Sequence, residues 1–308
     1  MSLPKQVTIV EVGPRDGFQN ESGFIPTKQK IKITDQLSET GLRRIEATSF
    51  VHPKAIPQLA DAAEVMAGIK RKEGIRYMAL IPNVKGVERA LQAGVKEINL
   101  VVSASESHNK SNLNMSVAES LKALKEVARI ALDNGMRIRG SIATSFGCPF
   151  EGWVPPEKVD EIAREYLAMG VHEVCLADTV GMADPSQVSQ MVSRFRDKLK
   201  DVEFSLHFHN TRGAGMANVL AAMLEGANIF DASICGLGGC PYAPGATGNI
   251  PTADMVHMLE SMEIDTGVNL SKLIECARMV QDLLGRVLPG QVMKAGIVPW
   301  ATKKQASS

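Results

Sequence analysis

Residues 155–179 read P-P-E-K-V-D-E-I-A-R-E-Y-L-A-M-G-V-H-E-V-C-L-A-D-T. Apolar residues recur at helical spacing over 155–169, and prolines at the start of such a segment favour a helix N-terminus. Gly170 follows, where glycine can adopt the left-handed conformation that ends a helix. Residues 173–179 form an apolar run that is typical of a buried strand. The stretch predicts a helix, a tight turn and a strand.

The same order recurs along the chain. Glycine precedes a strand-like run at five further positions, which are Gly41, Gly74, Gly94, Gly135 and Gly226. Other helix-like segments cover 26–40, 117–134, 185–200 and 214–225, and the runs at 6–12 and 203–209 complete a set of eight strands. Eight alternating units predict a closed (β/α)8 barrel, the TIM barrel. An open doubly wound sheet is the alternative, because strand order cannot be read from sequence.

We predict one catalytic domain over residues 1–308, with the barrel at about 5–265. Apolar residues at helical spacing predict an added C-terminal helix over 269–285. The segment 301–308 is a polar tail.

Composition excludes several classes of protein. The 308 residues are 44% hydrophobic and 22% charged, and their formal net charge is zero, which gives no support for nucleic-acid binding or for electrostatic binding to a membrane surface. The chain has no long apolar run and no secretory signal at its start. Five cysteines without a C-x-x-C pair favour a reduced, cytoplasmic protein.

Several predicted strands alternate polar with apolar residues. The polar positions include Glu46, Asn99, Arg139, Ser141, Asp231 and Ser233. Because helices must cover the outer face of the barrel, these side chains are expected to line its interior. Burying Glu46 or Arg139 is costly unless each is paired or bound to a ligand. The pattern predicts a site that reaches down into the barrel.

His207 and His209 share one face of their strand, because successive side chains on a strand alternate in direction. The two histidines either form a polar surface that faces water or are a pair of metal ligands. Active-site residues of such barrels follow the carboxyl ends of strands, which here carry Arg15, Asp16, Gln19, Glu46, Thr48, Asp178, Thr179, Cys240 and Asn249. A carboxylate at the same mouth favours a metal site, although Asp16 alone is equally explained as a turn or cap residue.

Five motifs carry a family resemblance. V-G-P-R-D-G-F-Q-N-E (12–21), I-E-A-T-S-F-V (45–51), G-C-P-F-E-G (147–152), H-F-H-N-T (207–211) and G-L-G-G-C-P-Y-A-P-G-A-T-G-N (236–249) closely resemble the hydroxymethylglutaryl-CoA lyases. These belong to a wider group of metal-dependent barrels that includes isopropylmalate synthase. The resemblance implies Mg²⁺ or Mn²⁺ held by Asp16, His207, His209 and Asn249.

The resemblance also implies a reaction, the cleavage of 3-hydroxy-3-methylglutaryl-CoA to acetyl-CoA and acetoacetate. It implies catalytic roles for Arg15, Glu46, Asp178, His207 and Cys240. The metal lowers the pKa of the substrate hydroxyl, and the guanidinium of Arg15 suits the oxygen of the thioester enolate. Either His207 or Cys240 protonates the enolate carbon, Cys240 being otherwise a small apolar plug. Glu46 is expected to anchor Arg15 or orient a ligand rather than to act as a base.

Gln19, Thr179 and Arg212 are the further residues predicted, with Arg15, to bind substrate. The partner is an acyl-CoA thioester, and we expect a homodimer that functions in leucine degradation. A condensing acyltransferase of the isopropylmalate synthase type, a lyase for a related branched 3-hydroxyacyl-CoA and a non-catalytic metal-binding barrel are the alternatives.

Some positions depart from the family pattern, and they put the acyl group in question. Asn210, Arg212, His52 and Ala253 stand where relatives carry other residues. The segment 103–112 diverges as well. We interpret it as a solvated loop, or as contacts of His108, Asn109 and Lys110 with the CoA arm.

Overall fold

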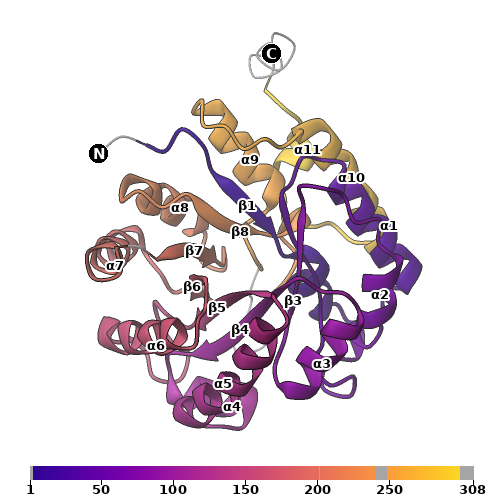
Figure 1. Cartoon of the computed structure of the whole chain (residues 1–308). Coiled ribbons are helices and arrows are strands. Elements are labelled where there is room, and N and C mark those ends of the chain that lie inside the picture. The colour runs from indigo at the N-terminus through magenta and orange to yellow at the C-terminus, as the bar shows by residue number, and fades with distance from the viewer. Residues whose placement is uncertain (1–2, 201, 240–247, 299–308) are drawn as a thin grey trace.

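The computed structural model describes residues 3–200, 202–239 and 248–298. Eight parallel strands form a closed barrel in which each pairs with the next and β8 pairs with β1 (Figure 1). The strands are β1 (Thr8–Glu11), β2 (Arg44–Ser49), β3 (Arg76–Leu80), β4 (Glu97–Ser103), β5 (Arg137–Ala143), β6 (Glu173–Asp178), β7 (Glu203–Phe208) and β8 (Ile229–Ala232). This order confirms the predicted (β/α)8 barrel and excludes the open sheet.

Helices surround the strands in Figure 1. They are α1 (Thr27–Ser38), α2 (Ala62–Gly68), α3 (Val84–Gln92), α4 (Glu106–Leu113), α5 (Val117–Asp133), α6 (Pro156–Ala168), α7 (Pro185–Lys198), α8 (Gly215–Leu224), α9 (Thr252–Ser261), α10 (Leu270–Leu284) and α11 (Val292–Ala295). Short helical turns occur at η1 (Gly13–Gly17), η2 (Pro57–Leu59) and η3 (Ile234–Gly236). Within the described part of the chain, no helix is long and apolar enough to cross a membrane.

The glycines that precede the strands have the conformation expected of them. All six, including Gly41 at φ 92° and Gly170 at φ 81°, lie in the left-handed region that other residues rarely adopt. At Gly41 a side chain is also excluded by space, since a Cβ atom would lie 2.2 Å from the carbonyl oxygen of Gly267. These turns fix where each helix ends and the next strand begins.

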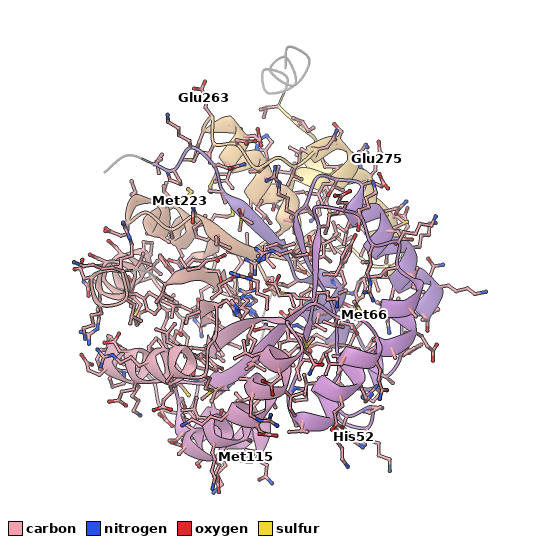
Figure 2. The ribbon with its side chains drawn as sticks, in the orientation of Figure 1. His52, Met66, Met115, Met223, Glu263 and Glu275 are labelled. Carbon is pink, nitrogen blue, oxygen red and sulfur yellow. The ribbon has the colours of Figure 1, made fainter. Side chains whose placement is uncertain are left out.

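The barrel has an apolar outer layer and a polar interior. On β4 and β5, Ile98, Leu100, Ile138 and Ile142 are fully buried in the main hydrophobic cluster, where each such side chain contributes about 1.5–3 kcal/mol. The polar set predicted to line the interior is buried as well, Glu46 and Arg139 completely. Figure 2 shows side chains converging on the barrel axis, whereas Glu263 and Glu275 lie at the outside.

The interpretation of 103–112 as a solvated loop is wrong. Helix α4 covers residues 106–113 and begins at Ser105, whose side chain accepts a hydrogen bond from the backbone N–H of His108. His108 and Asn109 are buried, and only Lys110 of the three candidate residues is exposed. Asn109 accepts from the backbone of Ser103, so the helix is fastened to the end of β4.

Candidate active site

The turn that follows β1 brings a cation into the barrel mouth. In this turn, η1, Arg15 donates from Nε to Glu46 Oε2 at 2.5 Å and from Nη1 to Asp16 Oδ1 at 2.5 Å. Burial opposes the charge of Arg15, but Glu46 and Asp16 outweigh it and raise the pKa of the guanidinium. Arg15 is therefore a fixed, permanently charged group that uses two of its five N–H donors on these carboxylates.

Glu46, on β2, is also held by side chains of β4 and β5. Asn99 on β4 donates to Glu46 Oε1 at 2.9 Å, and Ser141 on β5 donates to Asn99 Oδ1 at 2.8 Å. All of these side chains are buried. The chain of hydrogen bonds links three strands, β2, β4 and β5, and leaves Glu46 engaged at both oxygens, which suits an anchor for Arg15 better than a proton acceptor.

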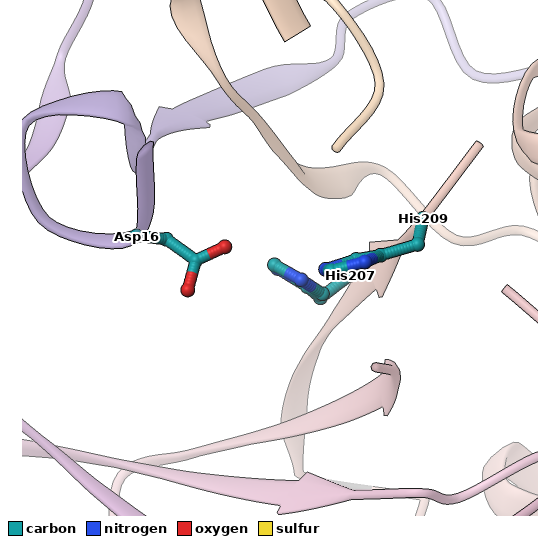
Figure 3. A group of neighbouring side chains, drawn as sticks. All are labelled: Asp16, His207 and His209. Atoms are coloured by element: carbon teal, nitrogen blue, oxygen red, sulfur yellow. The ribbon is translucent and has the colours of Figure 1, made fainter. Parts of the chain in front are cut away.

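Asp16, His207 and His209 converge beside Arg15. One possible ligand atom from each lies within 4.8 Å of the others, and the Asp16 carboxylate faces the two imidazoles (Figure 3). Asn249 completes the group, because its Nδ2 donates to Asp16 Oδ2 at 2.6 Å. His209 also pairs with Asn249 in an isolated β-bridge.

Two buried atoms in this group fit a bound cation. Asn249 Oδ1 and His209 Nδ1 have no hydrogen-bond partner, although such atoms are nearly always paired when buried. An amide oxygen, a carboxylate and two imidazoles form a donor set suited to a divalent cation that keeps open positions for substrate or water. No thiolate lies in this group of described residues, which disfavours a structural zinc site.

The charges of the barrel interior are also unbalanced. Three buried guanidiniums are paired with five buried carboxylates, through Arg15 with Asp16 and Glu46, Arg44 with Glu97 and Glu173, and Arg139 with Glu173 and Asp231. Arg76 also reaches Glu97, at 3.4 Å, but its side chain is 41% exposed to solvent. At the barrel mouth the single guanidinium of Arg15 faces two carboxylates, Asp16 and Glu46, and because isolated buried charge is costly this local excess of carboxylate favours a bound cation.

The protonation states match this role. Burial would raise the pKa of Asp16, but Arg15 and the two histidines hold it below its ordinary value. Burial, followed by the charge of His207, lowers the pKa of His209 to about 3. Near neutral pH the site contains an ionised carboxylate and a neutral imidazole, the forms that bind a metal.

Asp231 is a site residue that the analysis of the sequence placed in the interior but gave no role. Its Oδ2 lies 3.0 Å from His207 Nδ1, and both of its oxygens accept from Arg139 Nη2 at 2.7 and 2.8 Å. Burial acts against ionisation, yet Arg139 and His207 lower the pKa of Asp231 to about 2. The carboxylate favours the His207 tautomer with hydrogen on Nδ1, which leaves the Nε2 lone pair available.

A cavity of about 510 Å³ opens beside these residues. Its lining includes the polar residues Arg15, Asp16, Asn99, His207, His209 and Asp231, the apolar residues Val51, Ile56, Pro82, Leu113, Met115 and Leu124, and further polar residues at Asn83, His108, Asn112 and Ser120. Gln19 and Thr179 line it too. Gln19 donates to Asp16 Oδ1 at 3.2 Å, and Thr179 accepts from the backbone of Thr144. The cavity suits a ligand that has both polar and apolar parts.

Asp178 and Arg212, predicted to act in catalysis and substrate binding, do not line this cavity among the described residues. Asp178 accepts from the backbone N–H groups of Met182 and Ala183, and Arg212 donates to the carbonyls of Val180 and Gly181. Both side chains hold the turn between β6 and α7, and Arg212 is exposed. The catalytic role of Asp178 and the substrate-binding role of Arg212 stay predictions, beside this structural role. Cys240 lies outside the described residues.

Replacing His209 with alanine is expected to weaken Mn²⁺ binding by more than the roughly 10–100-fold that changes in outer-shell residues cost, because a ligand is removed. Titration of the metal-free protein with Mn²⁺ measures the dissociation constant. His172→Ala is the matched control, since His172 accepts a backbone hydrogen bond from Ile138 before β6. Equal Mn²⁺ affinities of wild type and His209→Ala would remove His209 from the ligand set.

The neutral state of His209 predicts a pH effect on the metal-free protein. An unfolded histidine binds a proton near pH ~6.5, so the unfolded chain gains a proton below that pH while buried His209, with its pKa at about 3, does not. Stability from this residue is therefore present above pH ~6.5 and falls by about 2 kcal/mol between pH ~7 and ~5.

Urea unfolding in the presence of a chelator tests this effect, with His209→Asn as the comparison. Burial raises the pKa of Glu11 to about 7 and that of Asp178 to about 6, and these groups act in the opposite direction over the same range. The difference between wild type and variant isolates His209. A difference that does not change with pH would contradict the neutral buried state.

Comparisons with known proteins agree with this geometry. The HMGL-like family model matches residues 6–280. The hydroxymethylglutaryl-CoA lyase YngG of Bacillus subtilis (strain 168) is 47% identical over 291 residues, covering 94% of this chain and 97% of that protein. A 3-hydroxy-3-isohexenylglutaryl-CoA/hydroxy-methylglutaryl-CoA lyase of Pseudomonas aeruginosa is 43% identical, covering 96% of this chain and 98% of that protein.

A solved structure shows the same architecture. It is an HMG-CoA lyase from Acenitobacter baumannii in complex with coenzyme A and 3-methylmalate, and it matches with a TM-score of 0.93 at 46% identity. The match covers 97% of this chain and 98% of the other. The predicted carbon–carbon lyase class is confirmed by these relatives, and the chain belongs to the HMGL-like family.

Proposed function

We propose that the protein cleaves 3-hydroxy-3-methylglutaryl-CoA to acetyl-CoA and acetoacetate. The observation that carries this proposal is a fixed guanidinium, Arg15, beside Asp16, His207 and His209 in a cavity lined by both polar and apolar side chains. A branched, hydroxylated acyl thioester presents hydroxyl and carbonyl oxygens to the polar side chains and an alkyl branch to the apolar ones.

The cleavage breaks the bond between the hydroxylated carbon and the carbon next to the thioester. The electron pair of that bond passes to the thioester as an enolate, whose oxygen carries the new negative charge. Arg15 stabilises this oxygen, because its donors are held in place before the reaction and need no reorganisation. Arg15 is buried inside the barrel, where exclusion of water strengthens electrostatic interactions of this kind.

Two proton transfers complete the reaction. The hydroxyl loses a proton as the carbonyl of acetoacetate forms, and the enolate carbon gains one to give acetyl-CoA. Asp231 lies against His207 Nδ1, so the lone pair at His207 Nε2 is free either to bind the cation or to take a proton from the substrate hydroxyl, but not to do both at once. Cys240 is the second candidate donor to the enolate carbon, and this role rests on the family resemblance alone.

Mg²⁺ or Mn²⁺ would be held by Asp16, His207, His209 and Asn249. A bound divalent cation would polarise the substrate oxygens and lower the pKa of the hydroxyl. Asn249 Oδ1 and His209 Nδ1, buried without a partner, support this ligand set.

Acetyl-CoA release from a panel of branched 3-hydroxyacyl-CoA thioesters, with and without Mg²⁺, tests the function. Release is expected with 3-hydroxy-3-methylglutaryl-CoA and is expected to disappear when a chelator removes the metal. Cleavage that is unaffected by chelation would contradict the metal site, and no cleavage of any panel member would contradict the lyase.

A longer branch on the acyl group is the second candidate. The apolar residues Leu113, Met115 and Leu124 line the same cavity, and one relative is named for an isohexenyl-branched substrate. A higher kcat/KM for a long 3-alkyl substituent than for 3-methyl in the same panel would favour this candidate.

We further propose a homodimer that acts in leucine degradation in the cytoplasm. The four described cysteines are free, in keeping with a reducing compartment. Light scattering of the purified protein tests the dimer.

A further inference from the structure

The buried carboxylate of Glu11 lies behind the proposed active site. Val10 and Val12 pack with Met78 in a small cluster inside the barrel, so Glu11 points to the opposite side of β1. Glu11 is fully buried and is not among the residues that line the cavity. It therefore has no contact with a substrate in that cavity.

Three donors from three separate segments meet at this carboxylate. The backbone N–H groups of Gly13 and Ile234 donate to Oε1 at 2.8 and 2.7 Å, and the Thr252 hydroxyl donates to Oε2 at 2.6 Å. Gly13 begins the turn that carries Arg15 and Asp16. Ile234 begins the segment that leads into the glycine-rich loop, and Thr252 follows Asn249 by three residues.

The three segments are packed too closely to shift independently. A Cβ atom on Gly13 would lie 2.7 Å from Glu11 Oε1, and one on Gly17 would lie 2.8 Å from Leu237 Cβ. Gly238 lies beside Asn249 and Asp16, because a Cβ atom on it would lie 2.4 Å from Asn249 Nδ2 and 3.1 Å from Asp16 Oδ2. The backbones of Ser233 and Thr252 are joined by a hydrogen bond of 3.1 Å. A displacement of one segment therefore changes the distance between Asp16 and Asn249.

We infer that Glu11 is a positioning residue, which sets the spacing of Asp16, Arg15 and Asn249 by fastening the three segments that carry or adjoin them. Burial raises the pKa of Glu11 to about 7, and the three donors oppose that rise. Either protonation state can keep the contacts, since one oxygen accepts both N–H groups and the Thr252 hydroxyl can donate or accept. The role depends on hydrogen-bond geometry rather than on charge.

The test compares Glu11→Leu with Glu11→Gln. Leucine removes every acceptor, whereas glutamine keeps an oxygen for the two N–H groups and an amide for Thr252. Glu11→Leu is expected to lower Mn²⁺ affinity and kcat by about 10–100-fold each, the cost typical of residues that orient metal ligands. Glu11→Gln is expected to stay within about threefold of wild type in both measurements.

Asp160→Leu is the matched control for lost stability. Asp160 is a buried carboxylate in the helical ring that accepts from Arg194 and Lys198. The Asp160→Leu substitution is expected to lower the urea concentration at the midpoint of unfolding without changing the Mn²⁺ affinity. Wild-type affinity and kcat in Glu11→Leu, or equal losses in Glu11→Leu and Glu11→Gln, would overturn the inference.

A milder pair of variants decides the matter if Glu11→Leu does not fold. Thr252→Val removes one donor and is expected to weaken Mn²⁺ binding by about 2–10-fold, whereas Thr252→Ser keeps the hydroxyl and the affinity. Unchanged affinity in Thr252→Val would then overturn the inference. Because the positioning role rests on the proposed function, Mn²⁺ binding, which needs no substrate, separates its failure from failure of the lyase reaction.

Discussion

Arg15→Lys is expected to lower kcat by about 10²–10³-fold while Mn²⁺ still binds, since removing one donor to a developing oxyanion typically has a cost of this size. Lysine keeps the positive charge but loses the planar fork that reaches Glu46, Asp16 and a substrate oxygen together. Steady-state kinetics with 3-hydroxy-3-methylglutaryl-CoA measures the loss. KM is expected to change less than kcat, because the interaction strengthens as the enolate forms.

Arg44→Lys is the matched control for this substitution. Arg44 is also a buried guanidinium between two carboxylates, Glu97 and Glu173, but it does not line the cavity among the described residues. It is expected to lower stability and to leave kcat within about tenfold of wild type. Similar kcat losses in both variants would mean that Arg15 acts only as part of the buried ion network.

The fold was predictable because its signals are local. Each helix, its terminal glycine and the following strand lie within about 25 residues, and the left-handed conformation of Gly170 depends only on its neighbours. Eight repeats of one pattern then restrict the architecture to very few choices. Helix α4 was missed because it is short and polar, and because its anchoring by Asn109 is a tertiary contact.

The site was predictable only where the chemistry is visible in a short motif. The H-x-H pair at His207 and His209, and the consecutive Arg15 and Asp16, can be read from the sequence. The pairing of His207 with Asp231 cannot, since it depends on the register between β7 and β8 and on Arg139 reaching across the barrel. Asp231 accepts a hydrogen bond from Arg139, and Asp16 accepts one from Asn249. In both pairs the partners are more than ninety positions apart in the sequence.

For Asp178 and Arg212, the sequence and the structure point to different roles. Both follow strand ends, which is where catalytic residues of barrels occur. The turn between β6 and α7 nevertheless has backbone groups of its own that must be paired, and these side chains pair them. Position along a strand therefore identifies candidates, and the predicted roles of Asp178 in catalysis and of Arg212 in substrate binding remain for variants to test.

Cys240→Ser is expected to lower kcat by about 10²–10⁴-fold with Mn²⁺ affinity nearly unchanged, the cost typical of losing a positioned general acid or base. An ordinary thiol has a pKa near ~8.5, within reach of proton transfer at neutral pH, whereas a serine hydroxyl does not titrate in that range. The substitution therefore keeps the size of the side chain and removes its acidity. Single-turnover kinetics would place the loss in the chemical step.

Cys235→Ser is the control, because the buried Cys235 thiol donates to the carbonyl of Ala277 at 3.2 Å and burial raises its pKa. The kcat of Cys235→Ser is expected to differ from that of the wild type by less than about tenfold, since Cys235 has no proposed part in the chemistry. The four described cysteines are buried, but Cys175 lines the cavity, so inactivation by an alkylating reagent, with protection by substrate, is expected to persist in Cys175→Ser and to disappear in Cys240→Ser. Near-normal turnover of Cys240→Ser would leave His207 as the other candidate donor to the enolate carbon, which would then have to carry a proton on Nε2 in addition to the one that faces Asp231 on Nδ1.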